Sequence, residues 1–267
     1  DANGVAAMLV PAAALLIFYA WKSKSNTSRI FIAILAIYII NAIVLINSRG
    51  AFLGVVVSGG YFIIHMLTAK FQQENQKQTA LLIIIISLSG ALYLTDESFW
   101  DRMNTLQDVT EEGGGRSGAS RTKMWLATFD LAEDHPLGVG AAGFQELSPK
   151  YVPEEMFFGN KRKKAVHSMW FQSLAEIGWL GLILFISLLV SCFRLTKKTK
   201  QKLILYNDAH HYFQVVAIEA ALLGYIVTGS FIDTFRFEIL YWFIMFTACA
   251  GNIFLFQPMQ KTSNDLY

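Results

Sequence analysis

The sequence predicts an all-α fold, a polytopic bundle of about seven transmembrane helices with a partly helical extracytoplasmic loop. Charged residues make up 16% of the chain, whereas soluble domains average about 25%. The apolar residues are concentrated in continuous runs, and the mean hydropathy is +0.41. Runs that are continuously apolar cross a membrane as helices, because helices satisfy all their backbone polar groups internally.

Seven segments approach or exceed the roughly 17 residues that a spanning helix needs. They are residues 5–21, 30–46, 51–69, 80–95, 168–193, 212–230 and 237–256. The chain therefore divides into four transmembrane helices in residues 1–95, a loop in 96–166, three transmembrane helices in 167–257 and a tail in 258–267.

The distribution of basic residues predicts the orientation. Lys and Arg gather in three connections and the tail, at Lys22, Lys24, Arg29, Lys70, Lys77, Arg194, Lys197, Lys198, Lys200, Lys202 and Lys261. The opposite short connections contain only Arg49 and Arg236. Because basic loops stay in the cytoplasm, we expect loop 96–166 to be extracytoplasmic and the tail cytoplasmic. The chain begins with Asp1 and has no recognisable signal peptide, so we expect it to be the C-terminal part of a longer protein.

Loop 96–166 is long enough to be either functional or disordered, and its apolar residues indicate folding. Residues 97–109 and the segment after Ser120 have helical spacing, joined by a Gly/Ser-rich linker in 110–120. Ser120 is the expected N-cap of the second helix, which carries an apolar stripe that includes Trp125. We expect a short helix to end before Pro153.

Arg49 stands at the outer end of the second predicted span. It fits an interfacial arginine that reaches the headgroups. It equally fits a ligand for a lipid-linked diphosphate, because a guanidinium binds phosphate through two parallel hydrogen bonds. Gly50, which follows it, would let a bulky group approach the backbone.

Arg121 lies at the predicted start of the loop helix, where a cation opposes the helix dipole. It is either a solvated residue or part of an anion site, in which free backbone N–H groups and the guanidinium face one ligand. Arg116, inside the linker, is a weaker candidate for the same role.

His167 ends the loop just before an apolar run. It is either an interfacial residue without a role, or a base or hydrogen-bonding group near neutral pH. The basic run before it, Lys161 to Lys164, is either solvated or attracts an anionic lipid or glycan. Glu176 lies about two and a half turns further along the predicted span, where an ionisable residue is a functional candidate or a structural partner of another helix.

The remaining titratable residues give weaker signals. His65 is expected to hydrogen-bond to a neighbouring helix, and Asp233 and Arg236 are either a local ion pair or part of the outer site. Cys192 and Cys249 lie in apolar runs and indicate no disulfide framework. No metal-ligand cluster and no nucleotide fingerprint is recognisable, so we expect no metal, no cofactor and no nucleic-acid partner.

The ordered set of motifs resembles the superfamily of O-antigen ligases and O-antigen polymerases. The motifs are "NSRGAFLGV", "SRTKMW", "DHPLGVGAAGF" and "HSMWFQSLAEIGWLGL". The resemblance covers nearly the whole chain, and "ESFWDRMNTLQ" is similar to the branch of O-glycosylation ligases associated with exosortase systems. Family members usually have more spans than this chain.

The resemblance implies a bacterial inner-membrane glycosyltransferase that takes its glycan from an undecaprenyl-diphosphate-linked donor, by inversion and without metal. The family's Ser-Arg-Gly motif falls on Ser48, Arg49 and Gly50, its loop arginine on Arg121 and its essential histidine on His167. We therefore expect His167, Arg49 and Arg121 to be catalytic, with Ser48, Gly50, Arg116, Trp125 and Glu176 binding substrate. The sequence "HSMW" replaces the His-Asn of many members.

Three functions remain open on the sequence. A ligase would transfer the glycan to a glycan, lipid or protein acceptor at the outer face of the membrane, and a polymerase would extend a lipid-linked chain. A non-catalytic glycan transporter would be expected to have Gly/Pro-broken spans and midplane charge. The scarcity of midplane charge and the polar loop favour chemistry at the membrane interface.

Overall fold

The computed structural model describes residues 2–71, 73, 75–94, 118–157 and 163–258, and these residues form helices and connecting segments without a strand. The α-helices are α1 Ala2–Lys22, α2 Asn26–Leu45, α3 Arg49–Thr68, α4 Gln76–Leu94, α6 Gly118–Asp134, α7 Gly143–Tyr151, α8 Met169–Leu205, α9 Ala209–Gly229 and α10 Glu238–Gly251. The short 3₁₀-helix η1 spans Glu154–Met156, and α10 continues into the π-helical turn η2, Asn252–Phe256. The predicted all-α class is confirmed.

Six helices among the described residues are long and apolar enough to cross a membrane. They are α1, α2, α3, α8, α9 and α10 with its extension η2. Helix α4 covers most of the fourth predicted segment but is not one of these six helices. The chain is a multi-pass membrane protein. The predicted helix 97–109 and residues 110–117 of the predicted linker, with Arg116, lie outside the described residues, and residues 118–120 of that linker belong to α6.

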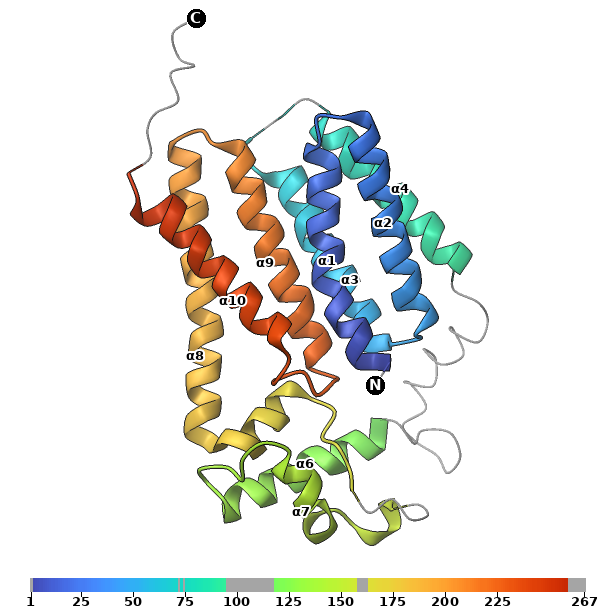
Figure 1. The fold of residues 1–267 in the computed structure, drawn as a ribbon, viewed down its shortest axis with the longest axis vertical. Helices are drawn as coiled ribbons and strands as arrows, with labels where there is room; N and C mark the ends of the chain where they lie inside the picture. The colour runs from blue at the N-terminus through green and yellow to red at the C-terminus, as the bar shows by residue number, and fades with distance from the viewer. Residues whose placement is uncertain (1, 72, 74, 95–117, 158–162, 259–267) are drawn as a thin grey trace, which may run out of the picture.

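Helix α9 is the centre of the bundle (Figure 1), and most of its residues are buried. Helices α1, α3, α8 and α10 pack around it. Its large buried side chains include Tyr225, whose hydroxyl donates to the Thr234 carbonyl at 3.1 Å, and Phe213, which meets Trp21 edge to face. Ser58 of α3 donates to the Ala220 carbonyl at 2.8 Å, so the two helices approach closely enough for a side chain to bridge their backbones.

Helix α8 differs from the single straight span predicted for residues 168–193. It is kinked at Gly178, whose φ of 65° and ψ of −170° are not helical. The segment after α6 packs into the kink: Val139 N–H donates to the Ala175 carbonyl at 2.8 Å, and Trp179 N–H donates to the Pro136 carbonyl at 3.1 Å. Backbone groups that lose their helical partners at the kink thus form hydrogen bonds with the loop. The first nine residues of α8 turn away from its spanning part.

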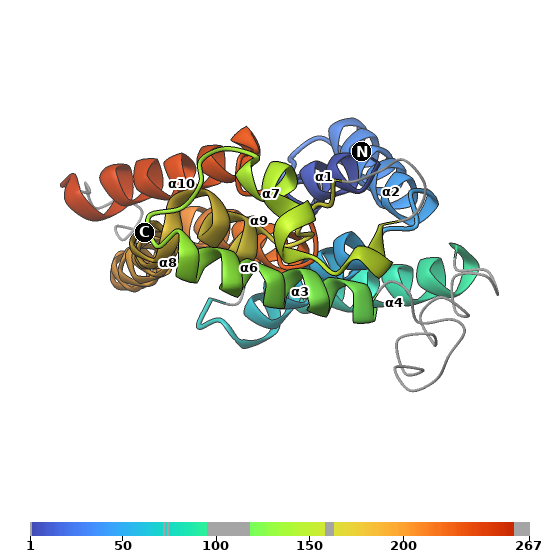
Figure 2. The ribbon, with the colours of Figure 1, turned by 90° about the horizontal axis from the view of Figure 1, so that it is seen from below.

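Helices α6 and α7 lie across one end of the bundle, as Figures 1 and 2 show, and we call this the loop end. They bury a second apolar cluster, separate from the bundle core, which includes Met124, Leu131, Phe144 and Ala175. The loop is therefore partly helical as predicted, and α7 ends before Pro153. Helix α6 begins at Gly118, so Ser120 lies inside its first turn and not before it as predicted.

The opposite end of the bundle contains the connections α1–α2, α3–α4 and α8–α9, and we call it the basic end (Figure 1). Its described basic residues include Lys22, Lys24, Arg29, Lys70 and Lys77. The short connections that are rich in Lys and Arg therefore lie at one end of the bundle, opposite the loop end.

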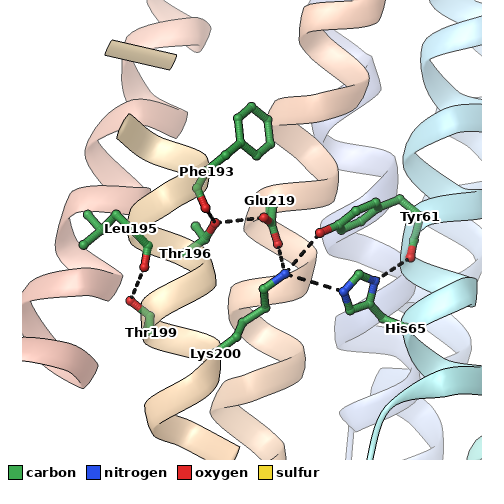
Figure 3. Close-up of polar contacts among 8 residues, drawn as sticks. All are labelled: Tyr61, His65, Phe193, Leu195, Thr196, Thr199, Lys200 and Glu219. Carbon is green, nitrogen blue, oxygen red and sulfur yellow. Dashed lines mark hydrogen bonds and ion pairs between the residues drawn. The ribbon is translucent and has the colours of Figure 1, made fainter. Parts of the chain in front are cut away.

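A buried polar network ties α3, α8 and α9 together toward the basic end (Figure 3). The Lys200 ammonium forms an ion pair with Glu219 and donates to the Tyr61 hydroxyl at 3.1 Å. The ring of His65 lies 3.5 Å from the same ammonium, and Thr196 donates to Glu219 at 2.8 Å. The hydrogen bond predicted between His65 and a neighbouring helix is confirmed. Lys200, which the charge pattern placed in a connecting segment, is a partly buried residue of α8.

Candidate functional site

Four polar residues from separate parts of the chain converge at the loop end. They are Arg49 at the start of α3, Arg121 in the first turn of α6, His167 just before α8, and Asp233 in the turn between α9 and α10. Arg121 interacts electrostatically with Arg49 and with Asp233. His167 interacts with Asp233 and with Arg121. The three residues predicted to be catalytic are therefore neighbours in space.

Arg49 is the first residue of α3, and the chain before it turns sharply. Asn47 has a φ of 57°, in the left-handed region, and Ser48 is the buried N-cap residue, whose side chain makes no capping hydrogen bond. A Cβ on Gly50 would lie 3.1 Å from the Cβ of Phe231, so this glycine allows α3 to pack closely against the end of α9. The close neighbour of Gly50 is thus another segment of the same chain.

Arg121 is half-buried, and burial is the main cause that lowers its pKa. The nearby Arg49 guanidinium lowers the pKa further, and the Asp233 carboxylate opposes both effects. Two guanidinium groups that repel each other at helix starts are unfavourable unless anions lie near them, and the Asp233 carboxylate is one such anion near Arg121. Their charge and position favour an anionic ligand.

His167 has a left-handed backbone, with a φ of 58°. Such a conformation is uncommon for a non-glycine residue and persists where surrounding contacts enforce it. The contact here is Asp233, whose Oδ1 accepts the Ser168 N–H at 3.0 Å and whose carboxylate also accepts the His167 N–H. Asp233 therefore holds the backbone that carries the imidazole.

The electrostatics of the pair favour a neutral imidazole. Burial lowers the pKa of His167, Arg121 and Lys164 lower it further, and Asp233 opposes this shift. Burial also raises the pKa of Asp233, against the effect of His167 and of the two backbone N–H groups. An imidazole that is neutral at neutral pH is able to accept a proton.

Trp125 has an internal role in the structure. Its ring stacks on Phe171 at a centroid distance of 5.1 Å, and its indole N–H donates to the Val166 carbonyl at 3.2 Å. Val166 directly precedes His167, so Trp125 fixes the segment that presents the imidazole. Lys163, the first described residue of the basic run, forms an exposed ion pair with Glu146 of α7 at 2.6 Å.

Glu176 lies just before the α8 kink, at the loop end, and not deep in a span as predicted. The carboxylate is 6% exposed, and its Oε1 accepts hydrogen bonds from Ala142 N–H and from Gln172 Nε2, both at 3.1 Å. Arg236 Nε lies 3.2 Å from the same oxygen. Arg236 therefore pairs with Glu176. The ion pairs of the described residues do not include one between Asp233 and Arg236, so that alternative from the sequence is wrong.

Gln172 is a site residue that the sequence did not single out. Its Nε2 donates to Glu176 and its Oε1 accepts the Phe235 N–H at 3.1 Å, which links α8 to the α9–α10 turn. The sequence offered one signal for this role: Gln172 lies four residues before Glu176 in an apolar run, so the two share a helix face.

The Ser168 hydroxyl is buried without a hydrogen-bond partner in the described part of the chain.

Fold and site together define a class: a multi-pass helical membrane protein with two arginines and a histidine–carboxylate pair gathered at one end of its bundle. A model of the family described as O-antigen ligase matches residues 34–186, more than half of the chain, from α2 through the α8 kink. The chain belongs to this family, as its motifs indicated. A search of curated proteins gives no match. Family membership makes the protein a glycosyltransferase-like enzyme, of the ligase or polymerase type, that acts on lipid-linked glycans.

Proposed function

We propose that the protein transfers a glycan from an undecaprenyl-diphosphate-linked donor to an acceptor hydroxyl at the outer face of the bacterial inner membrane. The observation that supports this proposal best is that Arg121 interacts electrostatically both with Arg49 and with His167. The loop end would face away from the cytoplasm, because the basic residues of the short connections gather at the other end.

The two guanidinium groups would bind the donor's diphosphate. Its charge would relieve their mutual repulsion, and two-pronged hydrogen bonds would orient it. Because the donor's lipid stays in the bilayer, its diphosphate would lie near headgroup height. With the loop end outside, the starts of α3 and α6 would lie near that height too. As the leaving group departs, the arginines would stabilise the negative charge that develops on its oxygen.

His167 would take the proton of the acceptor hydroxyl. The acceptor oxygen forms a bond with the anomeric carbon, and the bond from that carbon to the phosphate oxygen breaks. The diphosphate leaves with the electron pair, and attack from the opposite side inverts the anomeric centre. Asp233 would hold the imidazole in place and stabilise the imidazolium that forms.

Transfer rate against pH tests the role of His167 directly. With saturating donor in proteoliposomes, His167→Ala is expected to lose about 10²–10⁴-fold in rate. The parent rate should fall on acidification below the ordinary imidazole pKa of about 6.5, because burial lowers the pKa of His167. His167→Gln should lack this fall. A glutamine variant as active as the parent at every pH would show that His167 is not the general base.

The accumulated glycan in a deletion strain separates ligase from polymerase. Long lipid-linked polymer that is not transferred indicates a ligase, which is the function we propose. Single lipid-linked repeat units would indicate a polymerase that uses the same site.

A further inference from the structure

Helix α6 has an apolar strip on its exposed surface. Leu126 and Phe129, three residues apart and therefore on one face of the helix, are both exposed, Leu126 at 58%. By helical spacing, Lys123 and Asp134 lie on the neighbouring side. There Lys123 pairs with Glu155 of η1 at 3.2 Å, and Asp134 pairs with a lysine of α7 at 3.2 Å. One exposed side of α6 is therefore apolar, and the other is charged and lies toward α7 and η1.

The apolar strip continues onto the kink of α8. The Phe129 ring stacks on Trp179, the first residue after the kink, with ring centroids 6.0 Å apart. Leu137, in the segment that packs into the kink, is 77% exposed, and a Cβ on Gly178 would lie 2.5 Å from its carbonyl carbon. We call Leu126, Phe129, Leu137 and Trp179 the apolar patch. Exposed apolar side chains that gather in this way indicate an interaction surface.

The exposed apolar side of the α8 span begins where the patch ends. Leu180, Ile183 and Leu184 are exposed and recur at helical spacing in the spanning part of α8. Such a face on a spanning helix suits the hydrocarbon of the bilayer. Trp179 belongs to both surfaces, because its ring stacks on Phe129 and it directly precedes Leu180. The patch is thus continuous with the side of α8 that suits lipid.

The composition and direction of α6 fit the border between hydrocarbon and headgroups. Helix α6 crosses the loop end instead of following the direction of the spans, as Figures 1 and 2 show. A helix with one apolar and one charged side lies in this interface, with its apolar side about 5–10 Å deep. Tryptophan, as at Trp179, is enriched at the same border. Glu133, one turn beyond Phe129, is exposed on the apolar side, which favours a shallow position.

We propose that the apolar patch docks on the lipid surface of the bilayer that α8 spans, so that α6 is an interfacial helix. Lipid is the assigned occupant because the patch continues the exposed apolar side of α8, while the charged side of α6 lies toward α7 and η1. The docking depends neither on the proposed reaction nor on the compartment that the loop end faces. It holds Arg121, five residues before Leu126 on the same helix, near headgroup height.

Spin labelling tests the docking without a transfer assay. The full chain, with Cys192 and Cys249 replaced by alanine, carries one nitroxide at Leu126→Cys or at Leu137→Cys, in nanodiscs of phosphatidylethanolamine and phosphatidylglycerol. Oxygen concentrates in lipid, and a charged nickel chelate stays in water. At both positions oxygen should relax the nitroxide more than the chelate does, and the ratio should correspond to a depth of about 5–10 Å.

Three labelled control positions calibrate the measurement. A label at Ile183→Cys, on the exposed side of the α8 span, should lie deeper than the two patch labels. Labels at Asp130→Cys, on the charged side of α6, and at Glu154→Cys of η1 should be relaxed more by the chelate. Greater access of the chelate at Leu126 or Leu137 would place the patch in water and overturn the proposal. Poor access of both reagents there would show that protein, such as a second copy of the chain, covers the patch, and would overturn it too.

Discussion

Asp233 accepts the backbone N–H of Ser168 at 3.0 Å, although the two residues are 65 positions apart. The contact joins the turn between α9 and α10 to the segment that carries the imidazole, and it stabilises a left-handed backbone at His167. The same carboxylate opposes the effects that lower the pKa of His167. Asp233 therefore has a positional and an electrostatic effect that separate variants can distinguish.

Asp233→Asn tests the electrostatic effect. The amide oxygen keeps an acceptor for the two N–H groups, but the negative charge that raises the pKa of His167 is lost. The imidazole then stays neutral to lower pH, so the acidic fall of the transfer rate should shift to lower pH. The rate at neutral pH should also fall, because the imidazolium that forms loses the charge that stabilises it. Asp233→Ala also removes the acceptor and should lose rate at every pH. A shift to higher pH in the asparagine variant would contradict the assigned interaction.

Arg49→Lys tests whether the charge alone suffices. Lysine is a point charge and cannot form the two parallel hydrogen bonds of a guanidinium. We expect the lysine variant to lose most of the transfer rate, measured with donor concentration varied. The matched control is Arg29→Lys at the basic end, where Arg29 donates to the Ser23 carbonyl, and it should transfer like the parent. Parental transfer by Arg49→Lys would show that Arg49 only reaches the headgroups.

Cysteine labelling tests the orientation. In a chain with Cys192 and Cys249 replaced by alanine, a cysteine at exposed Glu154 of η1 should react with an impermeant thiol reagent added outside spheroplasts. A cysteine at exposed Gln201, in the basic part of α8, should react only after permeabilisation. The reverse pattern would place the site in the cytoplasm.

Six of the seven predicted spans lie on helices that are long and apolar enough to cross a membrane, because hydropathy decides these segments. Arg49, Arg121 and His167 were singled out by their motifs. Glu176 was misplaced because an apolar run continues through Gly178 without a signal for the kink. The kink depends on hydrogen bonds from the segment around Pro136, about 40 residues earlier in the chain. The pairings of Asp233 with Ser168 and of Arg236 with Glu176 likewise depend on tertiary packing between distant segments.

Gly178→Ala tests the kink that positions Glu176. A Cβ there would lie 2.1 Å from the Pro136 carbonyl oxygen, at a φ that disfavours any side chain. We expect a destabilisation of about 1–3 kcal/mol or more and a loss of transfer, measured by thermal unfolding and by the transfer assay. Gly140→Ala, at a φ of 80° but with open space around its Cβ, should destabilise less. Equal effects of the two variants would show that strain, and not the close approach, limits the position.

The Lys200–Glu219 ion pair tests how the bundle is held at its basic end. Replacing Lys200 by Met leaves the Glu219 carboxylate buried without its cation, although Thr196 still donates to it. Removing one partner of a buried pair typically costs about 3–5 kcal/mol, so Lys200→Met should lower the unfolding temperature strongly. Glu219→Leu should cost less, because the long, flexible lysine side chain is able to extend toward solvent or headgroups at the basic end. The double variant should recover most of the stability, since two apolar side chains pack without a desolvation penalty.

The matched control for this cycle is Lys163→Met, which breaks the exposed pair with Glu146 and should change stability by about 0–1 kcal/mol. Thermal unfolding of the purified chain in nanodiscs measures all four variants under one condition. If the losses of Lys200→Met and Glu219→Leu simply add in the double variant, the two side chains are not coupled, and the network in Figure 3 does not stabilise the packing of α8 on α9.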